Sequence, residues 1–107
     1  MARLVLVVRL WVRSGQKHAF EEFEKRAARL MGHYGGRIEQ AIRTCATADE
    51  RRDEASAPPF ETHIVTFPDA EAFEQYRYAS AQASNHGVRD SIIERTEVLK
   101  GEFVGPY

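Results

Sequence analysis

Apolar and polar side chains follow two rhythms along this chain, one with the two-residue period of a β-strand and one with helical spacing. The first rhythm predicts four strands, over residues 3–13, 37–44, 60–67 and 95–103. The second predicts helices from about 15 to 34 and from about 70 to 83, with a further short helix around 88–93. The order strand, helix, strand, strand, helix, strand predicts a four-stranded antiparallel sheet with its helices on one side.

The ends of the predicted helices carry recognisable signals. Ser14 is a plausible N-cap for the first helix, and Gly35-Gly36 is suited to end it because glycine adopts the left-handed conformation. Asp69 is the expected N-cap of the second helix, where its negative charge also favours the positive end of the helix dipole.

The first predicted strand is apolar on both of its faces. One face is wholly aliphatic, and we expect the helices to cover it; it comprises Leu4, Leu6, Val8, Leu10 and Val12. The other face alternates apolar with basic side chains and includes Val5, Val7, Arg9 and Trp11. So much apolar surface is unfavourable in water, and Trp and Arg are enriched in interfaces. We therefore predict an obligate homodimer in which these four residues meet a second copy of the sheet.

Composition limits the classes of function. The 107 residues are expected to form a single domain, and the net charge of −1, with scattered basic residues, argues against nucleic acid as a partner. No apolar stretch approaches the ~20 residues that cross a bilayer, so no membrane partner is expected. Cys45 is the single cysteine and cannot form an internal disulfide, which favours the cytoplasm. Residues 45–59 are polar and charge-dense, and are expected to form a mobile hairpin loop without a task, or else a lid.

Three segments carry a resemblance to a known superfamily: VVRLWVRSGQKHAFEEFEKRAARLMGHYGGRIEQAIR, THIVTFPDAEAFEQYR and RTEVLKGE. Together they resemble the dimeric α+β barrel proteins, which include the antibiotic-biosynthesis-monooxygenase-like proteins, and most closely a bacterial branch of unknown function. The resemblance implies a ferredoxin-like βαββαβ fold of the α+β class, whose sheets face each other across a two-fold axis. It also implies a ligand cleft between the sheet and helices of each protomer, and its relatives include cofactor-free quinol monooxygenases, heme-degrading monooxygenases and lactone isomerases.

The heme-degrading relatives allow a comparison of individual residues. Their functional Asn, Trp and heme-ligating His fall on Val8, Phe67 and His86 of this sequence. Only the histidine is retained, so heme degradation is not expected and no cofactor is predicted. The same alignment implies that Val8, Phe67 and His63 face the cleft.

His63 is the candidate for chemistry. Strand alternation places it on the same face as Phe67, toward the helices, where burial favours a neutral imidazole that can accept a proton from a hydroxyl or an acidic C–H. The structural alternative, which we favour, is a core histidine bonded to a backbone carbonyl or to Tyr76. Tyr76 itself is expected in the core or lining the pocket, and His86 either lines the cleft or ends a helix in water. No histidine pair or carboxylate has ligand spacing, so no metal is predicted.

Three functions remain open on the sequence alone. The first is a dimeric binding protein whose cleft holds a small apolar or aromatic molecule. The second is a cofactor-independent monooxygenase or isomerase acting on a quinol-like or enol-like substrate, with His63 as general base. The third is a structural dimer with a filled cleft. They differ in one observable, namely whether His63 and His86 border a cavity or are sealed in packing.

Overall fold

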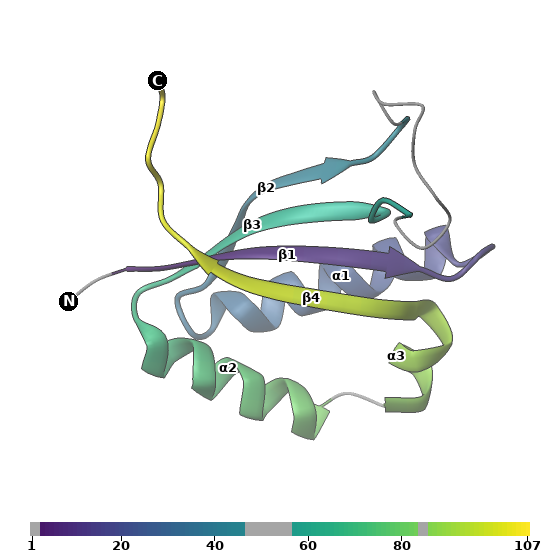
Figure 1. The fold of residues 1–107 in the computed structure, drawn as a ribbon. Helices are drawn as coiled ribbons and strands as arrows, with labels where there is room; N and C mark the ends of the chain where they lie inside the picture. The colour runs from purple at the N-terminus through teal and green to yellow at the C-terminus, as the bar shows by residue number, and fades with distance from the viewer. Residues whose placement is uncertain (1–2, 47–56, 84–85) are drawn as a thin grey trace.

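The computed structural model describes residues 3–46, 57–83 and 86–107, and its elements follow the predicted order (Figure 1). The strands are β1 (Leu4–Val12), β2 (Arg37–Arg43), β3 (Glu61–Phe67) and β4 (Ile93–Gly101). The helices are α1 (Lys17–Gly32), α2 (Ala70–Ala83) and α3 (His86–Ile92). The four strands pair antiparallel in the order β2-β3-β1-β4, so the predicted ferredoxin-like α+β architecture is confirmed.

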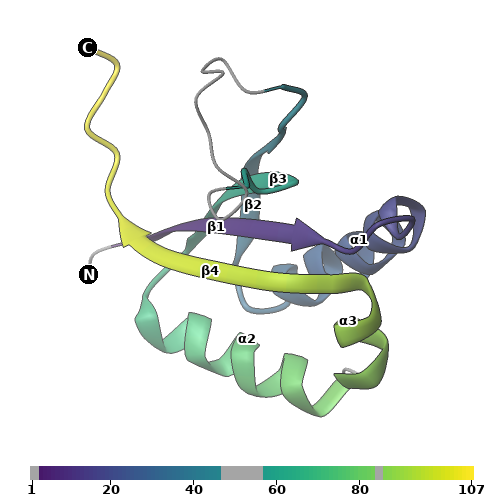
Figure 2. The ribbon, with the colours of Figure 1, turned by 45° about the vertical axis from the view of Figure 1, so that its right-hand side comes forward.

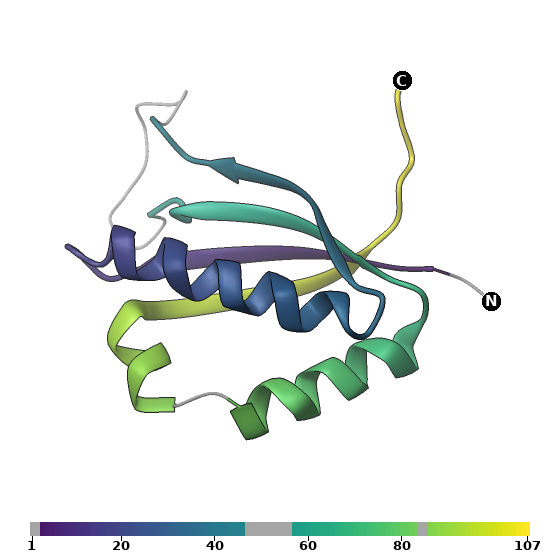
Figure 3. The ribbon, with the colours of Figure 1, turned by 180° about the vertical axis from the view of Figure 1, so that it is seen from behind.

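All the described helices lie on one side of the sheet. Seen from behind, α1 lies in front of β1 (Figure 3). The second helix lies below β4 in both front views, and α3 leads directly into β4 at the opposite end of the sheet from the C-terminus (Figure 2). No helix of the described residues is long and apolar enough to cross a membrane.

The two predicted N-caps have different outcomes. Asp69 caps α2 as predicted, because its Oδ1 accepts a hydrogen bond of 2.8 Å from the Ala72 N–H. Ser14 does not cap α1, and that prediction is wrong: the residue before the helix is Gln16, whose side chain makes no capping bond. The turn after β1 uses Ser14 and Gly15 to change direction, with Gly15 at a φ of 79° and the Gln16 N–H donating to the Arg13 carbonyl at 3.1 Å.

Glycine is required where α1 passes into β2. Gly35 has a φ of 77°, and the Gly36 N–H donates to the Met31 carbonyl at 3.0 Å, which satisfies a carbonyl of the last helical turn. The ring of Phe67 lies directly against the Gly36 backbone. A Cβ at position 36 would lie 2.7 Å from Met31 Cγ and closer still to that ring, so a side chain cannot be added without displacement.

Two separate core clusters lie between the sheet and its helices. One contains Leu6, Met31, Val65 and Phe67, and the other contains Leu10, Phe20, Ile92 and Ile93. Val8 lies between them on β1, packs against both and is itself only half-buried. The core is therefore interrupted at Val8, near the middle of the sheet.

The helix-free face of the sheet is less exposed in a single chain than the sequence analysis assumes. Val5 is only 8% exposed, and Val7, Arg9 and Trp11 are half-buried. The Trp11 indole N–H donates to the Ala57 carbonyl at 3.0 Å, which gives it a partner within the chain. The expectation that a monomer leaves Val5, Val7 and Trp11 bare together is therefore wrong for Val5. Strand register places two more exposed apolar residues on this face, Leu99 opposite Val7 and Ile42 opposite Thr62.

Candidate functional site

A cavity of about 460 Å³ lies between the helix-facing side of the sheet and the three helices. Its walls are mostly aliphatic and aromatic, and Val8 and Val98 form part of its sheet side. Five residues with carboxyl, imidazole or guanidinium side chains also line it: Glu24, His63, Arg77, Arg89 and Asp90. The core is thus interrupted at Val8 because the cavity lies there.

The structure brings several of the predicted pocket residues to this cavity. His63, Val8, Phe67 and Tyr76 all line it, from three different elements. The remaining predicted pocket residue, His86, is the first residue of α3, and its side chain lies outside what the structure describes. The predicted interface residues Val5, Val7, Arg9 and Trp11 lie on the opposite face of β1, as strand alternation requires.

His63 is held between two carboxylates. Its Nε2 lies 2.7 Å from Glu61 Oε1, and its Nδ1 lies 3.7 Å from Glu24 Oε2, which is too far for a direct hydrogen bond. Only 4% of the imidazole side chain is exposed. The partners are therefore carboxylates, whereas the structural alternative expects a backbone carbonyl or Tyr76.

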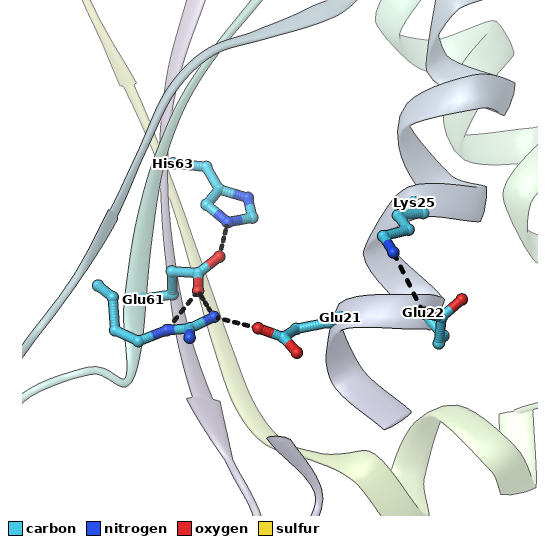
Figure 4. Close-up of polar contacts among 6 residues, drawn as sticks. Glu21, Glu22, Lys25, Glu61 and His63 are labelled. Carbon is cyan, nitrogen blue, oxygen red and sulfur yellow. Dashed lines mark hydrogen bonds and ion pairs between the residues drawn. The ribbon is translucent and has the colours of Figure 1, made fainter. Parts of the chain in front are cut away.

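Glu61 joins this histidine to the surface. Arg43 donates to Glu61 Oε2 from both Nε and Nη2, at 3.0 and 2.6 Å, and the same guanidinium reaches Glu21 Oε2 at 3.2 Å (Figure 4). Burial alone would raise the pKa of Glu61, but the hydrogen bonds from His63 and Arg43 outweigh it and hold the pKa below its usual value. Glu61 is therefore a stable anion that fixes the orientation of the His63 ring.

Glu24 is a second carboxyl group at the site, half-buried, and no prediction from the sequence includes it. It extends from α1 into the cavity, and burial raises its pKa, an effect that the neighbouring His63 partly opposes. The sequence does carry a signal for it. Glu24 follows Phe20 by four residues and precedes Met31 by seven, so it lies on the buried stripe of an amphipathic helix. A carboxylate at such a position calls for a nearby partner.

The rim of the cavity adds a cation and a phenol. Arg89 of α3 donates to Thr96 Oγ1 at 2.8 Å and lines the cavity from the side of β4. Tyr76 of α2 packs its ring 5.5 Å from that of Phe67, and burial, followed by the charge of Glu24, raises the pKa of its hydroxyl. The site thus combines apolar walls with one acid–base pair, Glu24 and His63.

The described residues show no cluster suited to a metal ion. No group of three His, Cys, Asp or Glu side chains among them is arranged to hold one. The two cleft positions that correspond to the Asn and Trp of the heme-degrading proteins hold Val8 and Phe67, which offer no polar atom.

Comparison with known proteins yields similarity in structure only. No protein-family model matches the chain, and no curated protein matches it either. Among solved structures, a protein of unknown function from Rhodopseudomonas palustris superposes with a TM-score of 0.71 at 13% identity, over 97% of this chain and 84% of the other. A proposed antibiotic biosynthesis monooxygenase from Bacteroides thetaiotaomicron gives a TM-score of 0.64 at 13% identity, over 97% and 91%.

A third similar structure is an uncharacterised NIPSNAP domain protein from Burkholderia xenovorans, with a TM-score of 0.63 at 12% identity over 94% of each chain. These identities are too low to transfer an activity or a superfamily, but the superpositions confirm the predicted ferredoxin-like α+β fold. What the site does must be argued from its own residues.

Proposed function

We propose that the protein binds a small, largely apolar or aromatic molecule in the cavity between its sheet and helices. The observation that carries this proposal is the cavity itself: its volume of about 460 Å³ falls within the range of ~300–1,000 Å³ that is usual for ligand sites. Apolar walls with a few convergent polar groups are the usual composition of such sites.

Aromatic rings line the end of the cavity nearest the start of α2. The ring of Phe67 lies 5.3 Å from that of Phe73 and 5.5 Å from that of Tyr76, both in tilted arrangements. Rings at these distances favour a further flat ligand ring, because aromatic pairs gain from offset and edge contacts as well as from burial. This supports an aromatic ligand over a purely aliphatic one.

The test is a titration with 2-methoxynaphthalene, a neutral aromatic probe of suitable size, followed by calorimetry and by backbone amide chemical shifts. We expect saturable binding, with shift changes at Val8, Val65 and Phe67, whose side chains face the cavity. Shifts confined to Val7 and Leu99, on the opposite face of the sheet, would locate the probe elsewhere and refute the proposal.

A second candidate, an enzyme, is favoured by the position of His63. An imidazole that borders a cavity and has a carboxylate on its other nitrogen is the arrangement of a general base and its orienting group. With Nε2–H donating to Glu61, the lone pair is on Nδ1, toward Glu24 and the cavity. The reaction class is the cofactor-independent oxygenation or isomerisation of a quinol or enol, and the name of the Bacteroides structure supports the first of these.

Oxygen consumption tests this candidate directly. A panel of quinols is offered to the wild-type protein and to His63→Gln, with folding checked by circular dichroism. Uptake that falls by about 10²-fold or more in the variant supports the base. Equal rates in both proteins, or no uptake with any quinol, would leave binding as the function.

We also propose that the protein acts as a homodimer joined through the helix-free faces of its sheets. Leu99 and Ile42 are 46% and 57% exposed on that face in the single chain. The same face carries two ion pairs, with Arg9 2.7 Å from Glu97 and Arg3 2.7 Å from Glu39. Protein interfaces combine apolar residues with polar groups, and arginine is enriched in them. Cys45 is an exposed free thiol, which supports a reducing location such as the cytoplasm.

A further inference from the structure

Glu24 occupies a position in the cavity that neither the binding proposal nor the base proposal uses. It is one of two carboxylates that line the cavity, and it lies on the stripe of α1 that packs against the sheet. Its side chain keeps 19% of its surface exposed, although residues on both sides of it along the stripe are buried. Within the part of the chain that the structure describes, its one basic partner within 4.0 Å is His63, whose Nδ1 lies 3.7 Å from Glu24 Oε2.

His63 is less accessible than Glu24 to a molecule in the cavity. Its side chain is 4% exposed, against 19% for Glu24, and its Nε2 is already bonded to Glu61. A ligand atom that enters from the cavity therefore meets the carboxyl group before it meets the imidazole. Glu24 is the better placed of the two to contact a polar ligand group directly.

The surrounding charges indicate what kind of polar group fits. Arg89 from α3 and His63 from β3 act as positive charges on Glu24, while Glu61 from β3 opposes them. The negative charge of Glu24 also acts on Tyr76 of α2, where it adds to burial in raising the pKa of the phenol. Because two basic groups already face this carboxylate, a ligand cation would meet repulsion from both. A neutral hydrogen-bond donor carries no such penalty, and a carboxylate accepts hydrogen bonds only.

We propose that Glu24 is the group that contacts the polar end of the ligand, and that the ligand is an aromatic or enolic molecule with a free hydroxyl whose O–H donates to the Glu24 carboxylate. This inference rests on the proposed binding function and adds the chemical class of the ligand. His63 is then a positioning residue: fixed by Glu61, its ring lies 3.7 Å behind the Glu24 carboxyl group and partly opposes the effect of burial, which raises the pKa of Glu24. If the hydroxyl proton moves, its O–H bond breaks, the electron pair stays on the ligand oxygen, and Glu24 takes the proton.

A matched pair of probes isolates the hydroxyl. The two probes, 2-naphthol and 2-methoxynaphthalene, have the same ring system, but only the first can donate a hydrogen bond. Wild-type protein is expected to bind 2-naphthol about tenfold more tightly, the size expected of a hydrogen bond to a charged acceptor. Glu24→Leu is expected to bind both probes equally, with the affinity for 2-methoxynaphthalene unchanged or increased.

The control is Glu22→Leu, which removes a carboxylate from the same helix at a site outside the cavity, where Glu22 pairs with Lys25. It is expected to keep the tenfold preference. A preference that survives in Glu24→Leu, or that is missing from the wild type, overturns the inference while the binding function stands. Failure of the wild type to bind either probe would overturn both proposals.

A pH series separates contact from a merely structural role. The preference for 2-naphthol requires an ionised Glu24, so it is expected to fade as the pH falls through the raised pKa of this group. Because Glu24→Leu shows no preference at any pH, its probe ratio is expected to stay flat over the same range. A wild-type ratio that does not change with pH would contradict the assignment. Circular dichroism of each protein at each pH confirms that the fold is retained.

Discussion

His63 Nε2 lies 2.7 Å from Glu61 Oε1, although the two residues are only two positions apart on one strand. Both side chains point to the helix-facing side of β3, and both are almost completely buried. The pair avoids the usual cost of burial because Arg43 neutralises Glu61 from the neighbouring strand. A row of ionisable side chains thus runs from Arg43 at the surface through Glu61 and His63 to Glu24 at the cavity, across a sheet face that is mostly apolar.

Glu61→Gln is expected to lower the free energy of unfolding by about 1–3 kcal/mol at pH 7, because it removes the negative charge from a buried hydrogen-bonded network. Urea unfolding measures the loss. Glu74→Gln is the control, since Glu74 pairs with Arg77 at 3.3 Å on the surface, and its effect is expected to stay within about 0.5 kcal/mol.

The pH dependence of the Glu61 effect has a defined sign. The folded-state pKa of Glu61 is below 4.5, so its contribution to stability is present above 4.5 and is lost as the pH falls through the lowered value. The difference between wild type and Glu61→Gln is therefore expected to shrink below pH 4.5. A difference that stays constant down to acid unfolding would show that the charge is not responsible.

Glu24→Leu is expected to show the opposite pH trend. The folded-state pKa of Glu24 is raised above 4.5, so its contribution is most favourable below 4.5 and declines as the pH rises through the raised value. Relative to wild type, the variant should gain stability as the pH increases from 4.5, until Glu24 is ionised in both states. Urea unfolding at a series of pH values measures this gain, and a gain that is independent of pH would contradict it.

Ala27→Phe is expected to fill the cavity from α1 and to weaken the binding of 2-methoxynaphthalene about tenfold or more, because Ala27 is part of its lining. Ala28→Phe is the matched control, since Ala28 is exposed and does not line the cavity. Calorimetry compares the two. Equal affinities in both variants would place the ligand outside this cavity.

Leu99→Glu is expected to convert the proposed dimer to monomer, raising the dissociation constant about 100-fold or more, because two-fold symmetry buries the new charge twice. Val98→Glu is the control: Val98 is adjacent and 49% exposed, but it faces the cavity, so this variant should remain dimeric. Analytical ultracentrifugation separates the outcomes. A wild type that sediments as a monomer at micromolar concentration would refute the proposed assembly.

The fold could be predicted from the sequence because the strand and helix periodicities agreed with the turn and capping residues between them. The rhythm of residues 60–67 predicts the β3 strand, and Asp69 marks the helix that follows it. The Ser14 prediction failed because a short polar side chain beside glycine suits a turn as well as a cap, and the turn formed. The prediction of a mobile hairpin loop or a lid over 45–59 falls mostly outside the described residues, which include only 45–46 and 57–59 of this segment.

The candidate site was less accessible, because its polar network depends on register between strands. Strand alternation alone places His63 toward the helices. The contact with Arg43 requires the pairing of Arg43 with Glu61 across β2 and β3, which no local pattern specifies. Glu24 could be identified from helical spacing, but a carboxylate on the sheet-facing side of a helix is easily assigned to the solvent side when nearby positions, here Glu21 and Glu22, are also acidic.

Because Gly36 has no side chain, the turn between α1 and β2 affects the shape of the cavity. Phe67 can rest on that backbone only because no methyl group stands there, and the same ring forms part of the cavity wall. Even the smallest side chain at this turn would push the ring, and with it one boundary of the cavity, toward whatever molecule occupies it. The dimensions of the cavity thus depend partly on a residue outside it, because Gly36, at the junction of α1 and β2, has no Cβ.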